Sequence, residues 1–422
     1  MNTVKLGEYG SFRNGLNFSK EESKGKGCKI LGVGDFENKT FIPVDSLDEI
    51  NTDLVTEDDI IQNGDIIFVR SNGNKSLVGR MLLAKGIEER ICYSGFCIRF
   101  RPYNSNNSLN LFYALKSPYC KKQYTPSQQT NITNLSQDKL SEVLIPDFLI
   151  TSSQNKAVNL LSNLDEMIDL NKRLCTELEA MAKTLYDYWF VQFDFPNENG
   201  KPYRTSGGAM EWCQELGREV PKGWKAGAVA DLGEIVSGAT PSTTEENYYT
   251  SNGIAWITPN DLSDNEHNMF IFHGERDITE AGLNSCSVVL MPAGSVLMSS
   301  RAPIGYLAIA ANSVCTNQGF KSIICNKDYG TLFVYYTLKR NIQGIARQGV
   351  GTTFKEVSRD TLARYTILLP DTTIAKRFEQ MVAPISQTSK KCEQENRELI
   401  ALRDWLLPML MNGQIKINEK GE

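Results

Sequence analysis

Apolar and polar positions follow two different periods along this 422-residue chain. Residues 152–190 and 373–411 contain no glycine, and their apolar residues recur every three or four positions, which is the period of an amphipathic helix. Elsewhere, short apolar runs are separated by Gly, Pro and polar residues, as in strands joined by turns. The pattern predicts an α+β chain in which each of two long helices follows a region of short strands.

The first helical stretch carries a heptad pattern, with a 3-4 spacing held over about four heptads. Its predicted packing positions are Leu160, Leu164, Met167, Asn171, Leu174, Leu178, Met181 and Leu185. Those of the second stretch are Met381, Ile385, Leu399, Leu402 and Leu406. We expect the two stripes to bury against each other as an antiparallel coiled-coil pair, in which Asn171 fixes register by requiring a hydrogen-bonding partner. Pro384 predicts a bend near the start of the second helix.

The chain also contains an internal repeat, because several segments recur about 222 to 231 residues further on. Residues 130–140 match 352–362, residues 64–70 match 294–301, and the pair Gly95-Phe96 matches Gly319-Phe320. The repeat predicts two α/β domains separated by the helices. The predicted organisation is a first domain at 1–150, a central spacer helix at 151–195, a polar linker at 196–225, a second domain at 226–370 and a C-terminal spacer helix at 371–422.

Charge follows the same repeat. Residues 35–65 hold ten Asp and Glu against one Lys, whereas residues 66–150 hold eleven Lys and Arg against five acids. In the second half, residues 231–280 hold ten acids against one Arg, and residues 281–370 hold nine Lys and Arg against three acids. The net charge of −5 therefore hides two basic segments, each with a net charge of +6, and does not argue against nucleic acid as a ligand.

Motifs for catalysis, metal binding and membrane insertion are missing from the sequence. There is no phosphate-binding glycine loop, no dinucleotide fingerprint and no His-Glu-x-x-His, and the chain has two histidines in all. The ten cysteines form no Cys-x-x-Cys pair, so we expect buried thiols and no metal site. No apolar run is long enough to span a bilayer, and the polar start lacks a signal-peptide core. We expect a non-catalytic, cytoplasmic binding protein.

Polar loops in both repeats carry the side chains that read DNA. Arg pairs with guanine, Asn or Gln pairs with adenine, and Lys, Ser or Thr contacts phosphate. The alternative for each such residue is an ordinary surface position or a turn former. The candidates in the first repeat are Arg70, Ser71, Asn72, Asn74, Lys75, Arg80, Gln128, Gln129, Thr130 and Asn131. Those in the second are Ser300, Arg301, Asn317, Gln318, Gln348, Thr352, Thr353 and Lys355.

Several motifs in the helices and the linker resemble those of a known family. They are Leu164-Asp165-x-x-Ile168-x-Leu170-Asn171, Trp189-Phe-Val-x-Phe193, Phe195-Pro-x-x-x-Gly200-Lys-Pro-Tyr203, Ser206-Gly-Gly208, Leu216-Gly-Arg218, Pro221-x-Gly-Trp224 and Gly238-Ala-Thr-Pro241. With two variable repeats each followed by a helix, the chain resembles the specificity subunit of type I restriction-modification systems. The resemblance covers essentially the whole chain, although Gly15-Leu-Asn-Phe18 departs from the Gly-x-Thr-Pro opening of the second repeat.

The resemblance implies a function without catalysis. Each repeat would read one half of a bipartite double-stranded DNA target, and the helices would set the spacing between the halves. Two adenine methyltransferase (M) subunits would dock around the helices, and translocase-nuclease (R) subunits would join. No cofactor would bind this chain, while S-adenosylmethionine and ATP would bind the partner subunits.

Two other interpretations remain open on the sequence. A fragment of a fused restriction-methylation enzyme would need a cofactor-binding loop and an Asn/Asp-Pro-Pro-Tyr/Phe tetrapeptide, neither of which is found in the sequence. A scaffold that joins protein partners through duplicated domains would have no affinity for DNA. DNA affinity that falls steeply with salt would distinguish a DNA reader from a scaffold.

Overall fold

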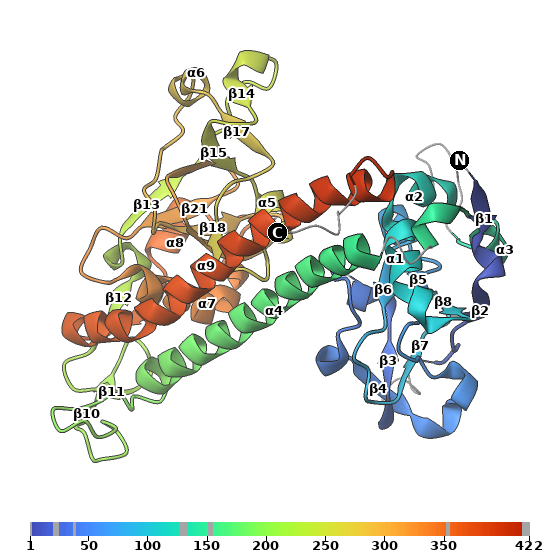
Figure 1. The fold of residues 1–422 in the computed structure, drawn as a ribbon. Coiled ribbons are helices and arrows are strands. Elements are labelled where there is room, and N and C mark those ends of the chain that lie inside the picture. Colours follow the sequence, from blue (N-terminus) through green and yellow to red (C-terminus); the bar gives the residue numbers. More distant parts are fainter. Residues whose placement is uncertain are drawn as a thin grey trace, which may run out of the picture. The chain divides into compact units, whose positions relative to one another are not determined.

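The chain forms two compact units that share two long helices. The computed structural model describes residues 2–19, 25–36, 39–125, 134–150, 155–351 and 355–415. Unit 1 comprises Met1–Leu170 with Asn396–Glu422, and unit 2 comprises Asn171–Glu395. The long helices α4 (Asn155–Tyr186) and α9 (Thr372–Met411) each run through a unit boundary (Figure 1). The units therefore divide the chain inside the helices, whereas the sequence predicted boundaries at the helix ends.

The described residues of unit 1 form two main sheets and three short α-helices. The four-stranded antiparallel sheet has the order β2 (Gly10–Asn14), β8 (Cys97–Pro102), β5 (Ile66–Val69), β6 (Met81–Leu83). The three-stranded sheet has the order β4 (Asp48–Asn51), β3 (Gly27–Leu31), β7 (Ile91–Tyr93), with β3 and β7 parallel. The remaining elements are the strand pair β1 (Thr3–Lys5) and β9 (Leu144–Pro146), and the helices α1 (Ser108–Lys116), α2 (Pro118–Tyr124) and α3 (Gln137–Ser141).

Unit 2 has larger versions of the same sheets. Its five-stranded sheet has the order β13 (Glu234–Ser237), β21 (Lys321–Ile324), β18 (Val296–Ser300), β19 (Ile304–Ala310), β16 (Phe270–Ile271). Its four-stranded sheet has the order β14 (Tyr249–Thr250), β17 (Arg276–Ile278), β15 (Ile254–Ile257), β20 (Val314–Thr316). The other elements are the strand pairs β12 (Lys225–Ala228) with β22 (Thr366–Leu369) and β10 (Met210–Cys213) with β11 (Arg218–Pro221), and the helices α5 (Pro259–Asp264), α6 (Glu280–Asn284), α7 (Thr331–Arg347) and α8 (Arg359–Ala363).

The strand order of the two units is the same around the matched landmarks. The order β2, β8, β5, β6 in unit 1 corresponds to β13, β21, β18, β19 in unit 2. Gly64 and Gly294, which precede the central strands, have φ angles of 95° and 86°. Gly79 and Gly305 likewise have φ angles of 85° and 109°. Glycine adopts this left-handed backbone without steric cost, so the matched glycines form matching turns.

The hydrogen bonds shift one of the sequence matches by a residue. Arg70 N–H donates to the Phe96 carbonyl oxygen at 2.7 Å, whereas Ser300 N–H donates to that of Gly319 at 2.8 Å. By this pairing Arg70 corresponds to Ser300, and Phe96 corresponds to Gly319 rather than to Phe320. A shift of one residue along a strand moves a side chain to the opposite face. Phe320 is accordingly buried, while Phe96 is exposed.

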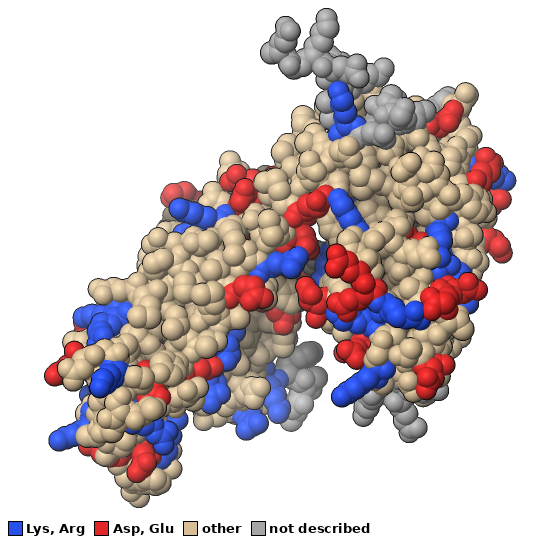
Figure 2. Space-filling model, turned by 60° about the horizontal axis from the view of Figure 1, so that its bottom comes forward, with Lys and Arg blue, Asp and Glu red and all other residues tan. Residues whose placement is uncertain are grey.

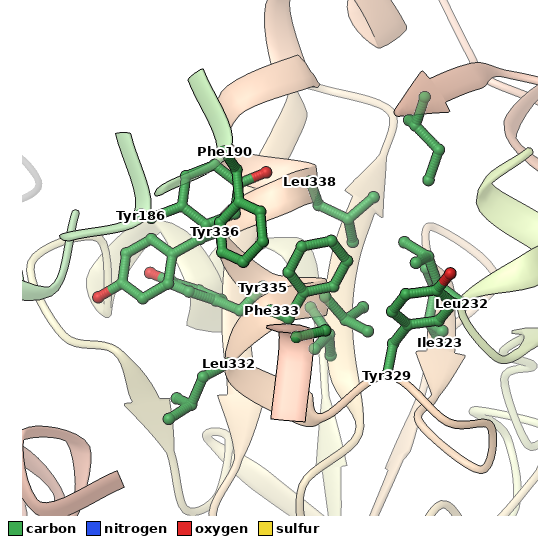
Figure 3. Packing of buried hydrophobic residues seen from close by; sticks show 14 of the residues in the cluster. Tyr186, Phe190, Leu232, Ile323, Tyr329, Leu332, Phe333, Tyr335, Tyr336 and Leu338 are labelled. Atoms are coloured by element: carbon green, nitrogen blue, oxygen red, sulfur yellow. The ribbon is translucent and has the colours of Figure 1, made fainter. Parts of the chain in front are cut away.

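An aromatic cluster forms the centre of unit 2. Phe190, in the π-helical turn Asp187–Val191 that follows α4, lies 4.9 Å from Phe333 and 5.2 Å from Phe378 between ring centroids. Tyr186 lies 5.0 Å from Phe190 and 5.8 Å from Tyr336, and the close-up view shows these rings grouped at the end of α4 against α7 (Figure 3). Offset and edge contacts of this kind stabilise a core beyond the burial of apolar area. The Trp-Phe motif that carries the family resemblance is therefore a packing motif.

The face of α4 that is buried differs from the predicted seam. Leu164 is buried, and Asn171, Leu178, Leu185, Ile385, Leu399 and Leu406 are half-buried. The predicted packing residues Leu160, Met167, Leu174, Met181, Met381 and Leu402 are instead 37% to 54% exposed. In α4 their place is taken by side chains one position later, namely Leu161, Ile168, Cys175 and Ala182. The prediction failed for these six residues because α4 and α9 each pack on the domain cores as well as on each other, and a heptad count does not separate two apolar faces.

Contacts between α4 and α9 run antiparallel within each unit. In unit 2, the Asn171 side-chain amide donates to Glu395 at 3.0 Å, and Cys175 Sγ lies 3.7 Å from the Ser389 carbonyl oxygen. In unit 1, the Asn396 amide donates to the Ile168 carbonyl oxygen at 3.3 Å. Asn171 thus has a hydrogen-bonding partner on the facing helix. α9 continues as one helix past Pro384.

Glu393 on α9 is a buried carboxylate in unit 2. Glu393 is only 5% exposed, and its two carboxylate oxygens accept hydrogen bonds from the N–H groups of Met269 and Phe270, both at 2.9 Å. Burial raises the pKa of Glu393 to about 7, in spite of these two hydrogen bonds, and the nearby Glu179 carboxylate raises it further. The contact between α9 and the 269–270 segment is therefore sensitive to pH near neutrality.

We expect the Glu393 carboxyl group to make unit 2 less stable as pH rises. Because its folded pKa is above its unfolded value, its contribution is fully present below about pH 4.5 and is lost as pH rises through about 7, by about 3 kcal/mol. Glu393→Gln should remove this part of the pH dependence. Urea unfolding of the wild type and the variant from pH 5 to 8 measures it, with Glu177→Gln on an exposed face of α4 as the control. Equal pH slopes for the wild type and Glu393→Gln would contradict the assignment.

Candidate nucleic-acid interface

Three segments of unit 1 meet at the end of strand β5. Arg70 and Ser71 follow the strand, and Arg70 Nη1 donates to the Gly95 carbonyl oxygen at 3.5 Å. Ser71 forms a β-bridge with Asn134, and the next residue, Leu135, donates its N–H to the Arg70 carbonyl oxygen at 2.8 Å. Arg70 and Ser71 are half-buried, and Asn134 is exposed. Backbone bonds thus hold two candidate residues in place while their side chains remain accessible.

The loop that follows is shaped by its own side chains. Asn72 Oδ1 accepts the N–H of Asn74 at 2.8 Å, and Asn74 Oδ1 accepts the N–H and the hydroxyl of Ser76 at 3.0 and 2.9 Å. These hydrogen bonds form turns. The side-chain carbonyl groups of Asn72 and Asn74 therefore act as turn formers, which is the alternative to a DNA contact. Lys75 is exposed and Arg80 is half-buried.

Unit 2 repeats this arrangement at the end of strand β18. Arg301 forms a β-bridge with Glu356, and Val357 donates its N–H to the Ser300 carbonyl oxygen at 3.0 Å. Asn317 Oδ1 accepts the N–H of Gly319 at 2.9 Å, which fixes the adjoining turn. The remaining described candidates in this unit are all exposed, namely Gln318, whose side chain accepts the Thr240 hydroxyl, Gln348 and Lys355.

Ser300 is not accessible to a ligand. It is 0% exposed, and its hydroxyl lies 3.5 Å from the Lys321 ammonium group. The prediction that Ser300 contacts DNA was therefore wrong. The reason is that Ser300 lies inside β18, whose five residues are all buried, and only the next residue, Arg301, leaves the strand.

Six candidates lie outside the described residues and stay predictions. They are Gln128, Gln129, Thr130, Asn131, Thr352 and Thr353. The residues that follow these two segments, Asn134 and Lys355 with Glu356, lie beside the equivalent strand ends in unit 1 and unit 2.

The acidic segments neutralise part of the basic ones. Arg101 is 2.7 Å from Asp65, and Arg90 is 2.7 Å from Glu57. On the face drawn in Figure 2, Lys and Arg side chains lie close to Asp and Glu in mixed clusters. Among the described residues, by contrast, Arg70, Arg80 and Arg301 take part in no ion pair. The basic segments therefore offer less free charge than their net charge of +6 suggests, and Arg70 and Arg301 at the strand ends are among the described side chains that remain available to a phosphate or a base.

The described residues offer neither a cluster of metal ligands nor a helix that could span a membrane. Where the structure describes the chain, no three His, Cys, Asp or Glu side chains are grouped so as to hold a metal ion. All ten cysteines are free thiols. Within the described ranges, no helix has both the length and the apolar character needed to cross a membrane.

Sequence reasoning missed one exposed side chain at this interface. Phe96 is 62% exposed on the turn that accepts the Arg70 N–H. The sequence offered a signal, the Gly-Phe pair, but the match to the buried Phe320 concealed it. Only the strand register shows that Phe96 corresponds to Gly319 and not to the buried Phe320.

Comparison with known proteins gives one family across both units. A family model described as the type I restriction modification DNA specificity domain matches residues 1–180 and 221–396. The chain is 35% identical over 201 residues to the specificity subunit of the type I restriction enzyme MjaIX of Methanocaldococcus jannaschii, a match that covers 45% of each chain. It is 25% identical over 348 residues to the HindI specificity subunit of Haemophilus influenzae, covering 70% of this chain and 74% of that relative.

A solved structure shares the fold. The crystal structure of a type I restriction-modification S subunit from M. genitalium aligns with a TM-score of 0.55 and 13% identity, and the alignment covers 97% of this chain and 95% of the other. At this level of identity the likeness shows the fold alone.

Proposed function

Because the chain belongs to the family of type I restriction-modification DNA specificity domains, we propose that each of its units reads one half of a bipartite target in double-stranded DNA. The observation that carries the proposal is the arginine at each strand end. Arg70 and Arg301 have no ion pair among the described residues, and each lies beside a turn held by backbone hydrogen bonds. A positioned guanidinium of this kind can form a bidentate pair with guanine in the major groove.

The two units should read different bases. Their backbones follow the same order of strands, but equivalent positions hold different side chains, with Ser71 where unit 2 has Arg301, and Phe96 where unit 2 has Gly319. Since direct readout depends on side-chain chemistry rather than on fold, one scaffold used twice gives an asymmetric target.

We further propose that α4 and α9 set the spacing between the halves and dock two adenine methyltransferase (M) subunits. In support, α4 exposes Leu160, Met167 and Leu170 in unit 1 and Leu174 and Met181 in unit 2. Apolar side chains aligned along a helix are more typical of a docking surface than of a solvated face. Translocase-nuclease (R) subunits would join this assembly, and S-adenosylmethionine and ATP would bind to the partner subunits.

The test is a map of methylated adenines in cells that carry this chain with its methyltransferase partner, compared with cells that lack only this chain. A split motif that disappears on deletion is the expected result. Identical maps, together with DNA binding by the purified complex that does not weaken between low and high salt, would instead indicate a scaffold without DNA affinity.

Replacing Arg301 by Ala should weaken recognition of the second half-site only. The loss of a bidentate base contact corresponds to about 1 to 3 kcal/mol, or roughly 5- to 150-fold in affinity, and relaxes the preference at one base pair. Binding of the assembled complex to duplexes with single substitutions in either half measures it. Arg359→Ala, at an exposed position of α8, is the matched control. An equal effect of Arg301→Ala on both half-sites would contradict a base contact in the second.

A further inference from the structure

Phe96 is held rigidly with its ring toward solvent. Its carbonyl oxygen accepts N–H groups from Arg70 at 2.7 Å and Ser71 at 3.3 Å, and the turn is closed by Cys97 N–H to the Ser94 carbonyl oxygen at 2.9 Å. The ring is nevertheless 62% exposed. A single exposed apolar residue is ordinary on a protein surface. This residue differs because its backbone is fixed directly to two candidate DNA-contacting residues.

The turn forces this orientation of the ring. Gly95 N–H donates to the Leu16 carbonyl oxygen at 2.6 Å, and a Cβ atom on Gly95 would meet Asn17 Oδ1 at 2.1 Å. A side chain at position 95 would therefore have to displace that of Asn17, and the hydrogen bond to Leu16 fixes the turn against this segment. Cys97, where strand β8 begins, is fully buried, whereas Phe96 lies on the turn just before the strand and stays exposed. The exposure of Phe96 is a consequence of the backbone and not of a flexible loop.

Unit 2 has no side chain at the equivalent place. A Cβ atom on Gly319 would meet Pro259 Cγ at 2.9 Å and would lie 3.5 Å from Arg301 Nε. The guanidinium group of Arg301 therefore lies beside the position that the Phe96 side chain occupies in unit 1. One unit presents an apolar ring at this position and the other presents a charged hydrogen-bond donor.

We propose that Phe96 contacts the C5 methyl group of a thymine in the first half-site and so determines one base pair of that half. The inference rests on the proposed function. The thymine methyl group is the one apolar group that a base pair presents in the major groove, and an apolar side chain recognises it by contact. The guanidinium group of Arg70 donates to the carbonyl oxygen of Gly95, the residue before Phe96, and so places a hydrogen-bond donor beside the ring. The ring and the cation would therefore read neighbouring base edges.

Deoxyuridine is the probe, because it differs from thymidine only in lacking the methyl group. The complex of this chain with its methyltransferase partner is titrated with duplexes in which each thymine of the first half-site is replaced in turn. At one position the wild-type complex should lose about fourfold in affinity, the value expected for one buried methyl group. The Phe96→Ala complex should bind thymine and uracil equally at that position, which makes the ring and the methyl group a coupled pair.

Val350→Ala is the matched control, because Val350 is 79% exposed on a backbone-fixed segment of unit 2. It should keep the fourfold difference in the first half-site. Phe96→Leu should keep part of it, because leucine still offers an apolar contact. Since Phe96 is exposed, thermal unfolding of Phe96→Ala should match the wild type.

Three results would overturn the inference. The first is a first half-site without thymine, or one in which no thymine is sensitive to uracil. The second is a Phe96→Ala complex that keeps the wild-type sensitivity. The third is a rise in 2-aminopurine fluorescence next to the site that depends on Phe96 while uracil is neutral, which would make the ring a wedge between base steps. In each case unit 1 would still read its half-site. If the complex bound no DNA at all, the proposed function itself would fail.

Discussion

Exchange of residues 226–370 for the corresponding segment of another type I specificity subunit should replace one half of the methylated motif and leave the other half unchanged. The physical reason is that the first and last strands of the segment pair with each other. Residues 226–228 of strand β12, where the segment begins, pair with strand β22, where it ends, from Ala226 opposite Leu368 to Ala228 opposite Thr366. An exchanged segment therefore brings its own strand ends and turns without breaking a sheet.

The reciprocal exchange of residues 1–150 is the matched control. Strand β1 pairs with β9 in the same way, from Thr3 opposite Pro146 to Lys5 opposite Leu144, so the first and last strands of this segment also pair with each other. It should change the other half of the motif. Mapping methylated adenines in cells that carry each exchanged chain with the same methyltransferase measures both outcomes. Independent readout by the units is wrong if either exchange alters both halves or neither.

The parts of the fold that the sequence predicts depend on local signals. Gly64 and Gly294 mark matching turns because each precedes an apolar strand and takes a left-handed backbone that favours glycine. Arg70 and Arg301 could be selected for a similar reason, since each follows an apolar run and must leave the strand there. These assignments need no knowledge of which segments meet in space.

The parts that failed depend on partners distant in the chain. The roles of Ser300 and Phe96 were mispredicted because the strand register differs by one residue from the sequence match. Hydrogen bonds set that register, since Arg70 N–H donates to Phe96, 26 positions away, and Ser300 N–H donates to Gly319, 19 positions away. The prediction of the buried face of α4 failed for a related reason. Met167 and Ile168 are both apolar, and only packing against the domain decides which one is buried. The charge pattern misled in part because Asp65 and Arg101, 36 positions apart, form an ion pair.

Asp165 lies at the centre of a buried ionic group in unit 1. Its carboxylate, only 1% exposed, accepts hydrogen bonds from Arg403 of α9 at 2.8 Å, from the Tyr113 hydroxyl of α1 at 2.8 Å and from Lys116 of α1 at 3.4 Å. Burial raises the pKa of Asp165, but Lys116 and Arg403 together lower it further, so the pKa lies below its usual value. The Leu-Asp motif of the family resemblance therefore has a physical role, which is to join α1, α4 and α9.

Replacing Asp165 by Ala should destabilise unit 1 by about 3 to 5 kcal/mol at neutral pH, because it leaves Lys116 and Arg403 without their shared counter-charge. The folded pKa is depressed, so the contribution of the carboxylate is present above its unfolded pKa and is lost as pH falls below about 4. The difference between the wild type and the variant should therefore shrink in acid. Hydrogen exchange of the α1 amides, which reports on opening within one unit, measures it.

Asp169→Ala, one turn further along α4, is the matched control and should change stability by no more than about 0.5 kcal/mol. Asp165→Asn separates charge from shape, since the amide fills the same volume and still accepts the Tyr113 hydroxyl but cannot neutralise two cations. If Asp165→Asn kept wild-type protection of α1, the role of Asp165 would be packing and hydrogen bonding. If it lost most of what Asp165→Ala loses, and the loss faded in acid, the charge itself would hold α4, α9 and α1 together in unit 1.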